Sequence, residues 1–137
     1  MPDFELHHRL KADTLHVTSL PLSELLMMND SQYPWFILVP RQNYCTEIYQ
    51  LTDCDRIQLL EESCQLAKIL QTQFNPDKLN IATIGNLVPQ LHMHHICRYS
   101  DDPSWPAPVW GKMPPQTFSA EIALSRIAQI KNALALL

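Results

Sequence analysis

The sequence predicts an α+β protein, in which a mostly antiparallel sheet of about five strands accompanies one long helix and a C-terminal helix. Three observations predict this class. Short strand-like apolar segments come in neighbouring pairs, residues 52–73 repeat apolar side chains at helical spacing, and a second helical pattern begins at Phe118. The length and the absence of repeats indicate a single domain over residues 1–137, with its core at about 14–100.

The first four expected strands form two pairs. Residues 4–10 and 14–20 alternate loosely between apolar and polar side chains, and the three residues between them can turn, so a hairpin is expected. Residues 24–29 and 35–39 form the second pair. The latter is an unbroken apolar run between two prolines, which is typical of a central strand buried on both faces.

The long helix is expected over residues 52–73. Thr52-Asp-Cys-Asp is similar to a capping box, and apolar residues follow it at three- and four-residue steps. The Glu61-Glu62 pair is expected on the solvated edge of this helix. Its apolar face is expected to comprise Ile57, Leu60, Cys64, Ala67 and Leu70.

The second half of the chain reads as a strand at 78–84, a turn at Gly85-Asn86, and a further strand at 90–98. Residues 101–115 hold five prolines and two tryptophans, Trp105 and Trp110, so they are expected to form an ordered loop without regular structure. These tryptophans could cover a ligand or a partner subunit, or simply anchor the loop. The C-terminal helix follows.

Composition excludes several classes of function. The net charge is -4 without any basic block, so no nucleic-acid partner is expected. No apolar run approaches the roughly 20 residues of a membrane span, so no membrane partner is expected either. Four cysteines without close pairing, and no secretory pattern at the amino terminus, favour free thiols in the cytoplasm. Two glycines are too few for a glycine-rich phosphate loop.

Residues 90–98 concentrate three of the six histidines in an otherwise apolar run. In a strand, alternation places Gln90, His92 and His94 on one face and His95 on the other. Two imidazoles then point the same way. Neutral imidazole is a nucleophile, base or metal ligand near pH 7, so this face is expected to carry chemistry.

These residues resemble the histidine-triad (HIT) family. The resemblance rests on the Gly85-Asn86 step, on histidines alternating along the strand that follows, and on Arg98 after them. It extends upstream to Asn29-Asp30 before the buried strand and to the helix from Thr52, and so covers most of residues 20–100. Members of the family are nucleotide hydrolases and nucleotidyl transferases that act through a nucleotidyl-histidine intermediate. They usually pair through the main helix and an edge strand, so the resemblance implies a homodimer.

The resemblance also implies roles for individual residues. His92 would be the nucleophile, His94 would contact the phosphate or leaving group, and Asn29 would contact the ribose. Asn86 would donate to phosphate oxygens. Independently of the resemblance, Gly85 just before the histidine strand is expected either to adopt a positive φ or to allow close approach of a ligand. The expected catalytic residues are therefore His92, His94 and Gln90, and the expected substrate contacts are Asn29, Asn86, Gly85 and Arg98. Arg98 and Arg41 each end a strand that should border the site, where the side chain could contact phosphate or could be a solvated cap.

Two residues depart from the family pattern. Gln90 stands where the first histidine of the triad is usual, although glutamine can still form hydrogen bonds. His95 stands where an aliphatic residue is usual, on the face that should pack into the core. It is expected to be a buried histidine that is satisfied by a carbonyl or a carboxylate.

The expected function is hydrolysis of a nucleoside phosphoramidate or a dinucleotide at the α-phosphate. The expected ligand is of the purine-nucleotide type, and neither a cofactor nor a metal is expected. One alternative is a nucleotide-binding or sensing module without turnover, motivated by Gln90 and by the apolar Leu87 beside the phosphate-binding turn. Another is a metal site, in which the paired histidines gain a ligand from His7, His8 or His16.

Overall fold

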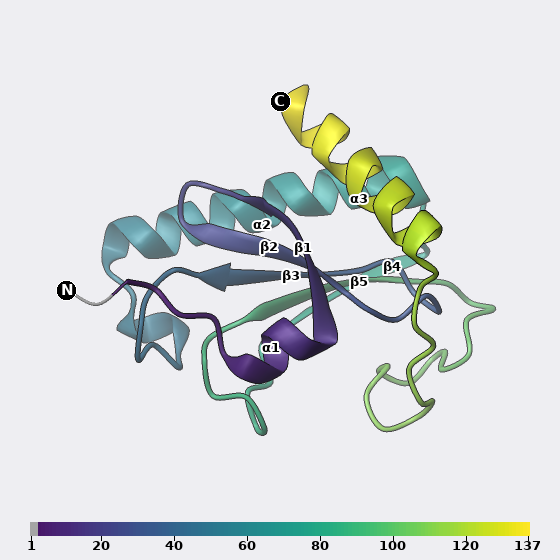
Figure 1. Cartoon of the computed structure of the whole chain (residues 1–137), viewed down its shortest axis with the longest axis horizontal. Helices are drawn as coiled ribbons and strands as arrows, with labels where there is room; N and C mark the ends of the chain where they lie inside the picture. The colour runs from purple at the N-terminus through teal and green to yellow at the C-terminus, as the bar shows by residue number, and fades with distance from the viewer. Residues whose placement is uncertain (1–2) are drawn as a thin grey trace.

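The computed structural model describes residues 3–137 and confirms the α+β class (Figure 1). Its strands and longer helices follow the expected order, with an additional short helix at the start. The elements are α1 (His8–Asp13), β1 (Thr14–Ser19), β2 (Ser23–Met28), β3 (Trp35–Pro40), the 3-10 turn η1 (Ile48–Gln50), α2 (Asp53–Phe74), β4 (Lys78–Ala82), β5 (Met93–Arg98) and α3 (Ala120–Ala135).

The strands form one five-stranded sheet in the order β1-β2-β3-β5-β4, and every neighbouring pair is antiparallel. All six residues of β3 are buried, as expected for the apolar run between prolines. The β3 and β5 strands pair with Ile37 opposite His94. This register brings the apolar run and the histidine strand together across 57 positions of sequence, from residue 37 to residue 94.

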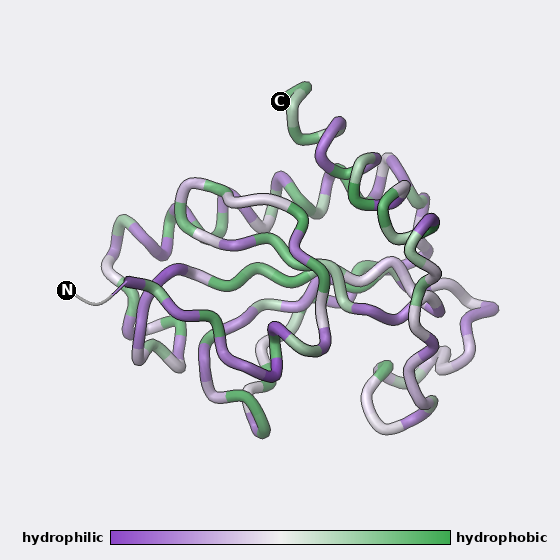
Figure 2. The backbone as a smooth tube through the Cα atoms, viewed as in Figure 1, coloured by the Kyte–Doolittle hydropathy of each residue, from purple (hydrophilic) through white to green (hydrophobic). Residues whose placement is uncertain are grey.

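Each face of the sheet has its own core. The helix face packs against α2 and α3, and its core includes Phe36, Cys97 and Leu66. The opposite face, called here the loop face, has a smaller core that includes Ile96, covered by Leu10 of α1 and Val109 of the proline-rich loop. Figure 1 shows the long α2 on one side of the sheet and α1 on the other, and Figure 2 shows the hydrophobic run along the centre of the sheet.

The predicted strand at residues 4–10 is wrong, because residues 4–7 have no regular structure and α1 begins at His8. His7 caps the helix, since its Nδ1 accepts a hydrogen bond from the Arg9 N–H at 3.1 Å. Leu10, which is 3% exposed, enters the core of the loop face. The helix cap and the burial of Leu10 therefore outweigh the loose alternation of apolar and polar residues that predicted a strand. Without that strand, β1 lies at the edge of the sheet and pairs only with β2.

The long helix is confirmed almost to the residue. Thr52 is its N-cap and accepts a hydrogen bond from the Asp55 N–H at 3.1 Å. The helix ends at Asn75, which adopts the left-handed conformation with a φ of 46°. Among the described residues, no helix has the length and apolar character that crossing a membrane requires.

The predicted apolar face of α2 is only partly right. Ile57 and Leu60 are 66% and 64% exposed, whereas Glu62 is 1% exposed. The Glu62 carboxylate accepts a hydrogen bond from the Leu22 N–H at 2.8 Å, so this residue caps a backbone group rather than lying on a solvated edge. The buried residues of α2 are Leu59, Glu62, Ser63, Leu66, Ile69 and Leu70.

Candidate active site

The histidine strand presents its imidazoles as the alternation predicts. His92 lies just before β5 and His94 lies within it, and their ring centroids are 4.8 Å apart. The two residues are 7% and 4% exposed. Ile96 lies on the same side in the core of the loop face, while Cys97 lies in the core of the helix face.

His92 is held in one tautomer by the main chain. Its Nδ1 lies 2.7 Å from the carbonyl oxygen of Gln90. A carbonyl only accepts, so Nδ1 carries the proton and Nε2 keeps an unprotonated lone pair. Burial lowers the pKa of His92, and the hydrogen bond to Gln90 offsets this only in part. The ring is therefore neutral at pH 7, with a nucleophilic nitrogen free.

His94 is held in the opposite tautomer. The indole Nε1–H of Trp35 donates to His94 Nδ1 at 2.9 Å. An indole N–H only donates, so His94 Nδ1 is the acceptor and the ring proton lies on Nε2. Burial, together with the neighbouring His92 and His95, lowers the pKa of His94 to about 3. Trp110 also packs edge-on against His94, with ring centroids 5.0 Å apart.

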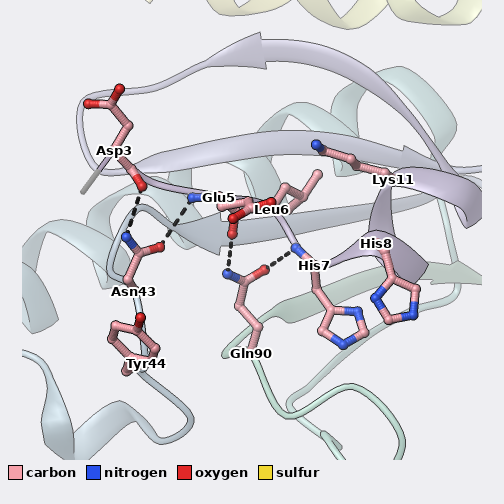
Figure 3. Close-up of a pocket in the computed structure, with 9 residues that line it drawn as sticks. All are labelled: Asp3, Glu5, Leu6, His7, His8, Lys11, Asn43, Tyr44 and Gln90. Atoms are coloured by element: carbon pink, nitrogen blue, oxygen red, sulfur yellow. Dashed lines mark hydrogen bonds between the residues drawn. The ribbon is translucent and has the colours of Figure 1, made fainter.

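Gln90 contacts the N-terminal segment with its side chain (Figure 3). Its Nε2 donates to the carbonyl of Glu5 at 2.9 Å, and its Oε1 accepts from the His7 N–H at 2.8 Å. Only the main-chain carbonyl of Gln90 meets His92. At the first position of the triad, the glutamine side chain therefore fixes residues 5–7, and the backbone orients the next histidine.

Two cavities flank Gln90. The first, of about 300 Å³, is bordered by His92, Gly85 and Glu47. Gly85 has a φ of +73°, which confirms the expected left-handed turn, and Asn86 beside it is exposed. The second cavity, of about 390 Å³, is lined by the N-terminal segment and Asn43 (Figure 3). A ligand bound in the first cavity would reach His92 directly.

Asn29 lies elsewhere. Its side-chain Oδ1 accepts a hydrogen bond from the Phe118 N–H at 3.0 Å, and its own N–H donates to the carbonyl of Asp13 at 3.0 Å. Among the described residues, no hydrogen bond links Asn29 to His92 or His94. Its observed contacts hold the segment that leads into α3 against the end of α1.

Arg98 is also engaged away from the histidines. It is 1% exposed, and its Nε and Nη2 donate to the two carboxylate oxygens of Asp102 at 2.8 and 3.0 Å. Burial would raise the pKa of Asp102, but hydrogen bonds from Arg98 and from the backbone outweigh it and lower the pKa to about 2. Arg98 Nη1 also donates to Asn80, and its guanidinium lies 5.8 Å from the Trp105 ring. This group therefore holds the proline-rich loop against the sheet.

Arg41 was also expected to border the site. Its guanidinium donates to the carbonyls of Leu20 and Pro21 between β1 and β2. It is therefore a backbone anchor in this structure.

His95 lies on the helix face and is confirmed as a buried histidine. Its Nδ1 donates to the carbonyl of Met93 at 3.2 Å, so its Nε2 accepts from the Ser63 hydroxyl at 2.7 Å. Burial lowers the pKa of His95 to about 4. Both ring nitrogens are satisfied, one by the expected carbonyl and the other by a hydroxyl.

The metal alternative gains no support. Within residues 3–137, no three His, Cys, Asp or Glu side chains come together in a way that could hold an ion. His7 and His8 stack on each other, with ring centroids 4.3 Å apart. His16 lies on β1, where it pairs with Glu24 at 3.1 Å.

Sequence reasoning missed Trp35 as a residue of the site. It was assigned only to the buried strand, although a buried tryptophan needs a partner for its indole N–H. That requirement, combined with a histidine strand elsewhere in the sheet, was the available signal. Finding the partner also required the register of β3 against β5.

The site therefore consists of two neutral imidazoles in different tautomers on one face of an antiparallel sheet, beside a glycine turn. The model of the HIT domain matches residues 9–101, and this chain belongs to the HIT family. No curated protein matched the chain.

Three solved structures of histidine triad proteins are similar to this chain over nearly their whole length. The protein from Marinobacter aquaeolei is 46% identical, with 99% of each chain covered and a TM-score of 0.95. The protein from Bradyrhizobium japonicum is 42% identical, with 96% of this chain and 98% of the other covered and a TM-score of 0.94. The protein from Sinorhizobium meliloti is 36% identical, with 95% and 96% covered and a TM-score of 0.93.

Proposed function

We propose that this chain hydrolyses a bond at the α-phosphate of a purine nucleotide derivative, a phosphoramidate or a dinucleotide, through a nucleotidyl-His92 intermediate. One observation carries the proposal. His92 borders a cavity, and its Nδ1 proton is held by a backbone carbonyl, so the Nε2 lone pair is free to attack. Membership of the HIT family supports the same chemistry.

The reaction balances in two steps. The Nε2 lone pair of His92 attacks the α-phosphorus, a P–N bond forms, and the bond to the leaving group breaks with its electron pair on that group. The ring becomes cationic and keeps its Nδ1–H on the Gln90 carbonyl, which stabilises the charge. Water then attacks phosphorus, the P–N bond returns its electrons to Nε2, and one proton is released to solvent.

In this proposal, glutamine instead of histidine at position 90 is compatible with catalytic turnover. The group that His92 requires from this position is the main-chain carbonyl, which any residue supplies. The glutamine side chain is committed to Glu5 and His7. Of the expected substrate contacts, the proposal keeps Gly85 and Asn86 for the phosphate. It leaves out Asn29 and Arg98, whose hydrogen bonds hold other segments of the chain.

The test is mass measurement after rapid quenching with a dinucleoside polyphosphate and with an adenosine phosphoramidate. We expect a nucleotidyl adduct on His92 during turnover, and we expect His92→Ala to lower the rate by at least about 10⁴-fold, because a nucleophile that acts within a unit carries most of the catalysis. His16→Ala, outside the site, is the matched control. Turnover that survives His92→Ala, or a wild type without an adduct, would refute the proposal.

A second candidate function is nucleotide binding without turnover. It is favoured by Leu87, which is 75% exposed next to the Gly85-Asn86 turn and offers phosphate no donor from its side chain. This candidate expects calorimetric binding of nucleoside monophosphates with hydrolysis at background. Running both assays on one preparation separates the two functions.

The proposal includes a homodimer. Ile57 and Leu60 are exposed one turn apart on α2, and Cys64 continues this stripe on the same helix. A second copy of the chain is the partner that the family resemblance implies for this helix. Sedimentation should show a dimer in the wild type and a monomer in Leu60→Asp, with Glu61→Lys on the same helix as a charged control. A monomeric wild type would contradict the proposed dimer.

A further inference from the structure

The hydrogen bond from Trp35 determines what His94 can do. Trp35 is 7% exposed and His94 is 4% exposed, so neither group can exchange its partner freely with water. The indole N–H lies 2.9 Å from His94 Nδ1. It occupies the only lone pair of the neutral ring, and the remaining nitrogen, Nε2, has no hydrogen-bond partner among residues 3–137.

The Trp35 donor and the neighbouring imidazoles oppose protonation of His94. A proton on Nδ1 would set two N–H donors against each other at 2.9 Å. The neighbouring titratable groups are His92 and His95, which add repulsion when charged, and no carboxylate bonds to the ring among the described residues. The Trp110 ring packs on another side of His94, with ring centroids 5.0 Å apart. The pKa of about 3 agrees with this geometry.

We propose that Trp35 is a positioning residue that locks His94 as a neutral Nε2–H donor, and that this lock makes the site selective for leaving groups that depart as anions. The selectivity rests on the proposed function, whereas the lock does not. A neutral imidazole donates a hydrogen bond but keeps its proton at pH 7. His94 can thus stabilise negative charge without acting as a general acid.

The two candidate substrates differ in that requirement. When His92 attacks an anhydride, the P–O bond breaks, its electron pair stays on oxygen, and the phosphate leaves as an anion that needs only a hydrogen bond. When it attacks a phosphoramidate, the P–N bond breaks and the nitrogen must also gain a proton, which locked His94 does not give. Water must supply it, and general-acid assistance worth about 100-fold or more is lost. The substrate class is therefore a phosphoanhydride such as a dinucleoside polyphosphate.

The lock is tested by ¹⁵N NMR of the histidine rings in the full chain. In the wild type we expect His94 to show an unprotonated Nδ1 and a protonated Nε2, unchanged between pH 8 and pH 5. Trp35→Phe keeps an aromatic ring but removes the donor, so His94 should become a mixture of tautomers and titrate at higher pH. Trp110→Phe is the matched control, because Trp110 contacts the same ring without a hydrogen bond to it. A wild-type His94 that is protonated on Nδ1, or that titrates above pH 5, would overturn the lock.

The selectivity is tested by turnover of diadenosine tetraphosphate and adenosine 5′-phosphoramidate. We expect the wild type to favour the anhydride about 100-fold in kcat, and Trp35→Phe to lower this ratio by at least about 10-fold while Trp110→Phe keeps it. Equal or faster cleavage of the phosphoramidate by the wild type would overturn the selectivity. Cleavage of neither substrate would overturn the proposed function together with the selectivity, and the NMR result would still decide the lock.

Discussion

Adjacent histidines on β5 face opposite sides of the sheet and show what separates a structural imidazole from a reactive one. His94 and His95 are both buried, and burial lowers both pKa values, to about 3 and about 4. On the helix face, His95 has both nitrogens satisfied, by Ser63 and Met93. On the loop face, His94 has one nitrogen fixed by Trp35, and its other nitrogen has no hydrogen-bond partner in the described part of the chain. Burial gives both a neutral ring, but only the free nitrogen offers chemistry.

The two faces are also held together differently. The helix face is a continuous apolar core between the sheet and two helices. The loop face depends in part on the ion pair of Arg98 with Asp102, because the proline-rich loop that covers it together with α1 has no regular structure. The polar network on the loop face should therefore be the more sensitive to single substitutions.

The largest expected effect on stability comes from breaking that ion pair. Asp102→Ala leaves the guanidinium of Arg98 buried and unpaired, which should cost about 3–5 kcal/mol of unfolding free energy. Urea titration measures it. Asp101→Ala removes the neighbouring exposed carboxylate and should stay within about 0.5 kcal/mol. Equal effects of the two substitutions would show that the ion pair does not hold the loop.

The next effect contrasts the two histidines in turnover. His94→Ala removes one donor to the transition state, which should lower kcat by about 10²–10³-fold. His95→Gln should leave kcat per folded molecule within a few-fold, since the hydrogen bonds of His95 go to Ser63 and to the Met93 carbonyl on the helix face. Steady-state kinetics on protein whose folded fraction is verified by circular dichroism tests this. A comparable loss of kcat in both variants would remove the functional distinction between the faces.

Sequence patterns predicted the features that a single segment encodes. The apolar run of β3, the Thr52 cap of α2 and the alternation of the histidine strand each carry their own signal. Sequence patterns did not decide between alternatives that fit the same local spacing equally well. In α2, two stripes have helical spacing, and only packing decides that Leu59 is buried while Leu60 is exposed. A prediction that places a helix correctly can therefore still misassign its buried face.

In the active site, too, the sequence predicted features that one segment encodes but not contacts between distant segments. Burial of His95 followed from alternation alone, whereas its Ser63 partner lies 32 residues away. Trp35 and His94 are 59 residues apart and meet through the register of β3 with β5. The segment holding Asn29 was predicted, but its contact with the Phe118 backbone, 89 residues away, was not. Contacts between remote elements depend on topology, which local patterns do not encode.

A third effect is a loss of folding stability at acid pH that arises from His94 and His95. Their folded pKa values, about 3 and about 4, lie below the ordinary 6.5, so the unfolded chain binds more protons between these limits. Their contribution to stability is complete above pH 6.5 and is lost as the pH falls toward 4 and 3. Each histidine adds a slope of up to about 1.4 kcal/mol per pH unit. Urea titrations between pH 7.5 and pH 4.5 should give a slope approaching two protons from these two histidines, in addition to the contribution of His92, whose pKa burial also lowers. The slope should fall by about one proton in His95→Gln. An unchanged slope in that variant would contradict the assignment.

The smallest effect tests whether the two faces are independent. Ser63→Ala removes the hydroxyl that donates to His95 Nε2 and leaves a buried acceptor unsatisfied, which should cost about 1–3 kcal/mol. Thr72→Ala, on the exposed side of the same helix, is the control and should change stability by less than about 0.5 kcal/mol. Turnover per folded molecule should not change, because the free nitrogens of His92 and His94 lie on the other side of the strand. A fall in kcat as large as that of His94→Ala would mean that the backbone of β5 transmits the disturbance to the loop face. The helix face would then have to be counted as part of the support of the site.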